Sequence, residues 1–234
     1  MKSSAVVRLT LPHRYDFGAD ADVVGEELLR PEAWDRVRLR TKGPFSIASD
    51  RDELEGQADR RPEVETRMRA VDAVLRDRGS RRVASYGVGG ALAELWLLRI
   101  DPLRRLLVTD YAPKTVERVR ELLPEAEVSR YDLLLDAPLD ADVHLFHRID
   151  TELDNRRWRQ VYQRFRRETI VIVAGEVLPP REIPRQLMSA IRDRHVTAAG
   201  WTRTIPAFES LWRRTHRSTH AVFGDLDGWV LDPR

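Results

Sequence analysis

The sequence predicts an α/β fold whose sheet is mostly parallel and ends in an antiparallel hairpin. From residue 62 onward, short apolar runs of strand character alternate with helical segments, which is typical of βαβ units. The last two apolar runs, 219–223 and 229–231, instead flank a glycine- and aspartate-rich segment at 224–228, which indicates a hairpin. With 234 residues, the chain is long enough for one such domain and an additional segment.

The expected elements follow in chain order. A helix begins at Pro62, because proline favours the first turn, apolar residues up to Leu75 recur at helical spacing, and Gly79 provides a stop. Strands are expected at residues 82–86, 106–109, 128–131, 143–146 and 169–174. Helices are expected at residues 92–98, 113–123, 156–166, 182–194 and 208–214. With the two strands of the hairpin, these segments predict a seven-stranded sheet with helices on both faces.

The first sixty residues are less regular. A strand is expected at 5–11 and a helix around 23–29, followed by a mixed charged stretch. Weak periodicity combined with aromatic residues is typical of a segment that becomes ordered when it packs on another surface. We therefore interpret residues 1–60 as a cap and residues 61–234 as the sheet domain.

Composition excludes several kinds of chemistry. The chain has no cysteine, which rules out disulfides, cysteine-ligated zinc, thiolate nucleophiles and cysteine-held iron–sulfur clusters. Its 40 basic and 38 acidic residues nearly balance and are interleaved, so a nucleic-acid surface is permitted but not indicated. No apolar run reaches the roughly 18 residues of a membrane span, and no signal peptide is apparent. We expect a cytoplasmic protein without membrane contact.

The strongest local motif is a strand that runs into a glycine-rich turn and then a helix. Its residues are Ser85-Tyr86-Gly87-Val88-Gly89-Gly90-Ala91. Glycines in this place allow the backbone to approach a ligand closely and present amide groups at a helix start. A tight turn without a ligand gives the same pattern, so the interpretation of this motif as a ligand site depends on the neighbouring residues.

Acidic residues end the next two predicted strands. Asp110 follows the strand at 106–109, where an acid can accept both ribose hydroxyls of an adenosine ligand. Asp132 ends the strand at 128–131. Because parallel strands end at one edge of the sheet, these residues and the glycine turn predict one nucleoside-shaped pocket. The alternatives are that Asp110 caps the helix near Pro113 and that Asp132 is a solvated loop residue.

Together these motifs resemble those of the class I S-adenosylmethionine-dependent methyltransferases, over about residues 62–234. The resemblance includes the glycine turn, Asp110-Tyr111, Tyr131-Asp132-Leu133, the strand at 142–147 and the terminal hairpin. It implies a Rossmann-like fold and S-adenosylmethionine as cofactor. It implies further that Gly87 and Gly89 face the methionine part of the cofactor, Asp110 the ribose, Tyr111 the adenine face, and Asp132 with the amide of Leu133 the adenine edge. Ser85 and Tyr86 are also expected among the cofactor-binding residues.

Two positions depart from the pattern of that family. Ser85 stands where an acidic residue is usual, which leaves open how the methionine ammonium is held. Ala91 stands where a third glycine is common, and we expect little cost from it because alanine is nearly as small. No Asn-Pro-Pro-Tyr-like run follows the fourth strand, so the chain does not resemble enzymes that methylate the amino groups of bases.

Candidate acceptor-binding residues follow from the same sheet edge and from the cap. His147 follows the fourth strand and titrates nearest neutrality, so it is the candidate general base; a histidine bonded to backbone is the alternative. Arg148 and Glu176 lie at the same edge, and Tyr15 and Trp201 are candidates for stacking on a planar acceptor. His216 and His220 lie four positions apart, but the sequence offers no third ligand beside them, so no metal site is expected.

The predicted function is methyl transfer to an oxygen, nitrogen or carbon of a small-molecule acceptor by a monomer or homodimer. Three alternatives stay open: an RNA-modifying methyltransferase, a nicotinamide-dinucleotide oxidoreductase and a non-catalytic nucleoside-binding module. Leu92, where the dinucleotide fingerprint has a small residue, and the terminal hairpin argue against the oxidoreductase. The sequence argues against a nucleic-acid partner without excluding one.

Overall fold

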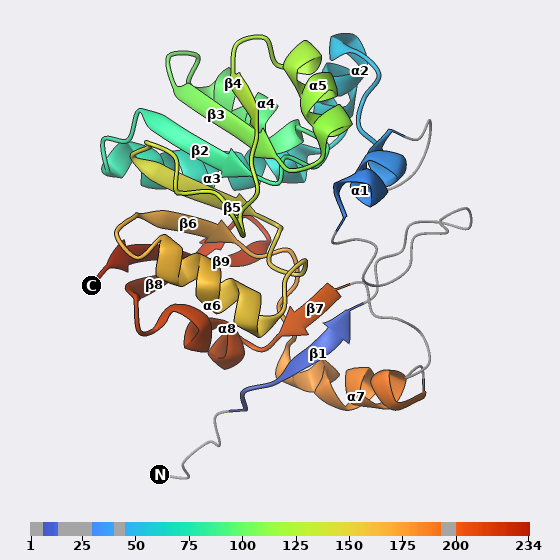
Figure 1. Cartoon of the computed structure of the whole chain (residues 1–234), viewed down its shortest axis with the longest axis vertical. Coiled ribbons are helices and arrows are strands. Elements are labelled where there is room, and N and C mark those ends of the chain that lie inside the picture. Colours follow the sequence, from blue (N-terminus) through green and yellow to red (C-terminus); the bar gives the residue numbers. More distant parts are fainter. Residues whose placement is uncertain (1–6, 14–29, 40–44, 193–199) are drawn as a thin grey trace.

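The computed structural model describes residues 7–13, 30–39, 45–192 and 200–234. Within these ranges a seven-stranded sheet has the order β4-β3-β2-β5-β6-β9-β8 (Figure 1). The parallel strands are β2 (Arg82–Tyr86), β3 (Arg105–Asp110), β4 (Glu127–Arg130), β5 (Val143–His147) and β6 (Ile170–Val173). β9 (Leu226–Pro233) is antiparallel to β6 and to β8 (His216–Phe223). The predicted fold class is confirmed.

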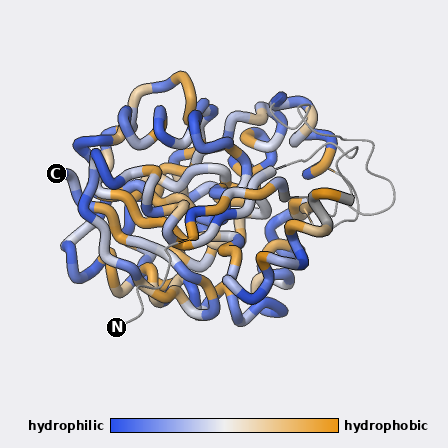
Figure 2. The backbone as a smooth tube through the Cα atoms, turned by 90° about the horizontal axis from the view of Figure 1, so that it is seen from below, coloured by the Kyte–Doolittle hydropathy of each residue, from blue (hydrophilic) through white to orange (hydrophobic). Residues whose placement is uncertain are grey.

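Helices cover both faces of this sheet. Successive strand residues point to opposite faces, so Val83 belongs to the buried cluster that includes Met68 and Leu95, whereas its neighbour Ala84 belongs to the cluster that includes Trp158. The first face is covered by α2 (Arg51–Asp59), α3 (Pro62–Asp77), α4 (Leu92–Ile100) and α5 (Pro113–Leu122), and the second by α6 (Asn155–Arg164) and α8 (Ile205–Trp212). In Figure 2 many hydrophobic stretches of the backbone run through the middle of the molecule, and hydrophilic stretches are frequent at the periphery.

The segment interpreted as a cap contributes to this core. Leu54 and Ala58 of α2 are fully buried in the cluster that also contains α3 and α4. The shorter helix α1 (Pro31–Arg38) lies at the edge toward which β2 and β3 point (Figure 1). The division of the chain at residue 60 stays a prediction, and α2 shares its packing with the sheet domain.

A small second sheet was not anticipated. β1 (Thr10–His13) pairs antiparallel with β7 (Gly200–Arg203), and Pro12 lies opposite Trp201. The predicted strand at 5–11 overlaps β1, whereas the helix predicted around 23–29 lies outside the described residues. The 3₁₀-helix η2 (Pro180–Glu182) and the α-helix α7 (Ile183–Arg192) precede β7. This pairing joins residues about 190 positions apart, which local sequence patterns do not reveal.

The terminal hairpin is tighter than predicted. The strands β8 and β9 extend to Phe223 and Leu226, so the turn is Gly224-Asp225 rather than all of 224–228. Gly228 lies inside β9, where a Cβ atom would stand 2.2 Å from the carbonyl oxygen of Ile172. This glycine permits close strand approach and does not form the turn, so its interpretation as a loop residue was wrong.

None of the described helices is long and apolar enough to cross a membrane.

Replacing Leu54 by alanine tests whether α2 belongs to the core. The side chain is completely buried, so Leu54→Ala should lower the free energy of unfolding by about 2–5 kcal/mol, the usual cost of a buried leucine. Leu103→Ala is the matched control because Leu103 is 91% exposed, and its effect should stay within about 0.5 kcal/mol. Equal and small effects in urea titrations of both variants would contradict this packing of α2.

Candidate functional site

The glycine-rich turn connects β2 to α4 in a left-handed conformation. Gly87 and Gly89 have φ angles of +68° and +57°, which glycine adopts without steric cost. The amides of Gly87 and Val88 donate to the carbonyl oxygen of Thr109 at 2.9 and 3.3 Å. These bonds tie the turn to the end of β3, so the two strand ends form one surface.

The small size of Ala91 led to the expectation that alanine costs little free energy at this position, and the structure differs from that expectation. The φ of Ala91 is +62°, a conformation that costs a residue with a Cβ roughly 1–2 kcal/mol. The side chain itself is fully buried. The cost of alanine at this position therefore comes from the backbone conformation and not from a lack of space.

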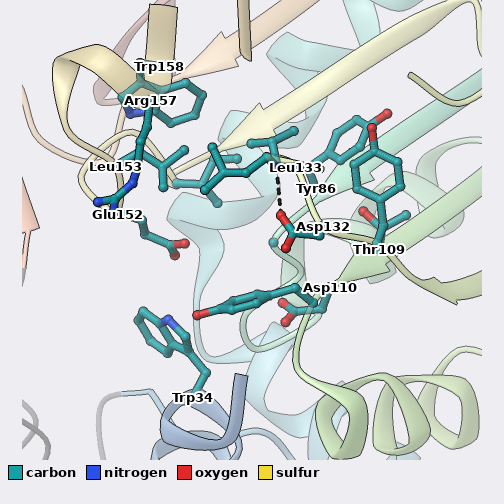
Figure 3. Close-up of a pocket in the computed structure, with 15 residues that line it drawn as sticks. Trp34, Tyr86, Thr109, Asp110, Asp132, Leu133, Glu152, Leu153, Arg157 and Trp158 are labelled. Atoms are coloured by element: carbon teal, nitrogen blue, oxygen red, sulfur yellow. Dashed lines mark hydrogen bonds between the residues drawn. The ribbon is translucent and has the colours of Figure 1, made fainter. Parts of the chain in front are cut away.

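A cavity of 260 Å³, called here the first cavity, lies at the carboxyl ends of the parallel strands (Figure 3). The strand ends contribute Tyr86, Gly87, Thr109, Asp110, Tyr111, Tyr131, Asp132, Leu133 and Leu134, the loop after β5 contributes Ile149, Glu152 and Leu153, and helices contribute Trp34, Arg157 and Trp158. The motifs predicted to form a nucleoside pocket thus meet in one place.

Asp110 is buried and bound on both carboxylate oxygens. Its Oδ1 accepts the amide of Ala112 at 3.0 Å, and its Oδ2 accepts Nη1 of Arg38 at 2.5 Å. Arg38 is itself buried. Burial alone would lower its pKa, but Asp110 and Glu152 outweigh that effect together, and the pKa of Arg38 is raised. Asp110 is therefore both a potential ribose acceptor and the partner of a buried guanidinium.

The cap of α5 comes from a different aspartate. Asp35 of α1 accepts the amides of Thr115 and Lys114 at 2.8 and 3.2 Å and the Thr115 hydroxyl at 2.9 Å. Such bonds satisfy free amides in the first turn of a helix. Through Asp35 and Arg38, α1 is held against the start of α5 and the end of β3.

Asp132 and Leu133 follow β4 at the wall of the first cavity. The Oδ1 atom of Asp132 accepts the amide of Leu134 at 2.8 Å (Figure 3). This bond fixes the carboxylate in a short turn, while the residue still lines the cavity. The interpretation of Asp132 as an adenine contact stays a prediction.

A second cavity of 520 Å³ continues along the glycine turn. It is lined by His147, Arg148 and Glu176, by Gly87 to Gly90, and by arginines of the first helices. Arg148 has a φ of +58°, and backbone strain of this kind is concentrated at functional sites. This cavity therefore holds three of the residues proposed to face an acceptor.

The role of His147 as a general base stays a prediction, and the environment of its imidazole disfavours that role. Burial, reinforced by Arg148 and Arg67, lowers its pKa to about 3. Its Nε2 is buried and has no hydrogen-bond partner among the described residues. The imidazole is neutral at physiological pH, but with so low a pKa it accepts a proton weakly.

Ser85 does not line either cavity. Its hydroxyl donates to Oε1 of Glu94 at 2.6 Å, and both side chains are buried. Burial raises the pKa of Glu94 to about 7, partly offset by this bond. Glu94 thus places an acid beside the position where the family motif has one, on the helix that follows the turn instead of on the strand.

The structure brings together most of the predicted residues. Trp201 is on β7 and lines neither cavity; its amide donates to the Thr151 carbonyl at 2.8 Å. A stacking role for Trp201 therefore has no support from its position, and Tyr15 lies outside the described residues. Sequence reasoning missed Arg38, Glu94 and Glu152. Only Glu94 carried a signal, as a single acid within the apolar segment 92–98.

Metal ligands do not cluster in the part of the chain that is described: no group of three or more histidines or acids there is arranged to hold a metal ion.

Comparison with solved structures identifies the fold as that of S-adenosylmethionine-dependent methyltransferases. One similar structure is human N-acetylserotonin methyltransferase, solved with this cofactor. The match covers 94% of the present chain and 63% of the human chain, at 16% sequence identity and a TM-score of 0.66. The match to mitomycin 7-O-methyltransferase covers 74% of the present chain and 54% of that enzyme, at 18% sequence identity and a TM-score of 0.58. The match to a putative O-methyltransferase from Nostoc punctiforme covers 70% of the present chain and 55% of that protein, at 12% sequence identity and a TM-score of 0.54.

The chain thus spans less than two thirds of the length of these structures. No protein-family model matches the sequence, and no curated protein matches it significantly. The Rossmann-like methyltransferase fold predicted from the motifs is confirmed by these likenesses.

Proposed function

We propose that the chain is an S-adenosylmethionine-dependent methyltransferase that acts on a hydroxyl oxygen of a small molecule. The observation that carries this proposal is the first cavity, where the glycine turn, Asp110 and Asp132 converge at one sheet edge. Two of the neighbouring structures are named for small-molecule acceptors, N-acetylserotonin and mitomycin, and two are named O-methyltransferases, which supports the acceptor class.

The residues present fit the cofactor. A Cβ atom on Gly87 would stand 2.5 Å from Cγ2 of Ile149, so the turn leaves room only for a bare backbone beside the cavity. Asp110 offers the remaining lone pairs of its carboxylate to ribose hydroxyls, while its Oδ2 atom stays bound to Arg38. When bound, the cofactor supplies an electrophilic methyl group.

The residues of the chain act mainly by positioning and by excluding water. Trp34 of α1 lines both cavities, and enclosing the reactants brings the acceptor oxygen into line with the methyl group. Because His147 accepts a proton weakly, we assign no strong base to the reaction. The acceptor would lie in the second cavity, beside Arg148 and Glu176.

Transfer of a radiolabelled methyl group tests this function. Incubation with labelled S-adenosylmethionine and a panel of phenols and other small hydroxyl compounds should label at least one compound, and the label should be resistant to treatments that cleave esters. Labelling of added RNA instead of any small molecule would contradict the acceptor class, and labelling of neither would count against catalysis.

A further inference from the structure

The two cavities meet at a small set of residues. Trp34, Gly87, Ile149 and Glu152 line both. This inference rests on the proposed function: the adenosyl part of the cofactor then occupies the first cavity, and the methionine part enters the second cavity along Gly87 to Gly90, beside the space left for the acceptor. The sulfur atom joins these two parts, so residues that border both cavities face the sulfur.

Glu152 is the single acidic side chain in this set. Its carboxylate points into the first cavity, near Trp34 (Figure 3). Among the described residues none donates a hydrogen bond to it, and the nearby cation Arg38 is bound to Asp110 instead. A carboxylate placed at the junction without a bonded partner is available to a ligand that carries positive charge there.

The loop that carries Glu152 is held rigidly. Arg203 is completely buried and donates to the carbonyl oxygens of Asp150 and Leu153 at 2.6 and 2.5 Å. The indole of Trp158 also donates to the carbonyl of Asp150 at 3.0 Å. Glu152 lies between these anchored residues, so its position is set before any ligand binds, and preorganised charges act most strongly.

We propose that Glu152 is the counter-charge of the cofactor's sulfonium and thereby distinguishes S-adenosylmethionine from S-adenosylhomocysteine. These ligands share the adenosine, the ammonium and the carboxylate, and they differ in the methyl group and the positive charge of the sulfur. A carboxylate at the junction attracts the substrate form and not the neutral product. This charge preference also favours product release after transfer.

The preference should depend on pH. Burial raises the pKa of Glu152 to about 7; Asp110 and Asp150 act in the same direction, and Arg38 opposes them. Tyr111 and Arg157 also line the first cavity, and His147, Arg148 and Glu176 line the second. Glu152 is ionised above its pKa and neutral below it. The preference for the sulfonium ligand should therefore increase as the pH rises from about 6 to about 8, which is about one pH unit on each side of this pKa.

Calorimetry with three ligands tests the proposal on the full chain. The ligands are S-adenosylmethionine, S-adenosylhomocysteine and sinefungin, which carries an amine in place of the methylated sulfur. Glu152→Gln should weaken the two charged ligands about tenfold, as expected for a lost bond to a charged group, and should change S-adenosylhomocysteine affinity less than about threefold. Glu121→Gln removes the same charge from a side chain of α5 that is 73% exposed, and it should leave all three affinities unchanged.

The outcomes separate this inference from the proposed function. Equal losses for charged and neutral ligands in Glu152→Gln, or a wild-type preference that is constant with pH, would overturn the role of Glu152 while leaving cofactor binding intact. If the wild-type chain bound none of the three ligands, the proposed function itself would fail.

Discussion

Gly87→Val should abolish the binding of S-adenosylhomocysteine, weakening it by more than about 100-fold, or about 2.7 kcal/mol. Two effects add at this position. A branched side chain is strained at a φ of +68°, and its Cβ would overlap Ile149, whose side chain lines both cavities. The measurement is calorimetric titration, accompanied by circular dichroism to establish that the sheet domain is folded.

Gly79→Val is the matched control for backbone strain. Gly79 also has a left-handed φ of +65°, but nothing lies within 4 Å of a Cβ built there. This variant should lower the melting temperature through the same strain and should keep its affinity for the ligand. Intact affinity in Gly87→Val would remove the basis for placing the cofactor at this turn.

Asp110→Ala should affect both stability and binding. Its removal leaves Arg38 buried without its partner, which costs about 3–5 kcal/mol of unfolding free energy. It should also weaken S-adenosylhomocysteine by about 1.5–3 kcal/mol, the range for hydrogen bonds to a charged acceptor. Urea titration and calorimetry measure the two effects separately.

Asp35→Ala shows whether Asp110 acts only by holding α1. Asp35 anchors the same helix to α5 and lines neither cavity. Its removal should lower stability by about 0.5–2 kcal/mol, as for other helix caps, with a smaller loss of affinity than Asp110→Ala. If both variants lost affinity equally, the ribose role of Asp110 would be wrong and its contribution would be the anchoring of α1.

The sheet and many of the residues that line the first cavity could be predicted from the sequence. Strand and helix periodicity gave the five parallel strands and the hairpin, and sheet geometry then placed Gly87, Asp110 and Asp132 at one edge. These inferences depend on local patterns and on a general property of parallel sheets, that ligands bind at the carboxyl ends of the strands.

The buried charges were not predictable in the same way. Arg38 belongs to a short helix rich in charged residues, which resembles a solvated surface helix, and its partner Asp110 is 72 positions away. Glu152 follows five residues after His147, and the sequence favours His147 as the reactive group there because histidine titrates near neutrality. Burial lowers the pKa of that histidine to about 3 and raises that of Glu152 to about 7, and neither environment is visible in the sequence.

The most direct test of the account is calorimetric titration of the wild-type chain with S-adenosylhomocysteine and, side by side, with NAD. The glycine turn and Asp110 suit either ligand, whereas the fold and the first cavity, with a volume of 260 Å³, favour the smaller S-adenosylhomocysteine. The account predicts saturable one-to-one binding of S-adenosylhomocysteine with micromolar affinity, about −8 kcal/mol, and no measurable heat with NAD. Binding of NAD without binding of S-adenosylhomocysteine would contradict it.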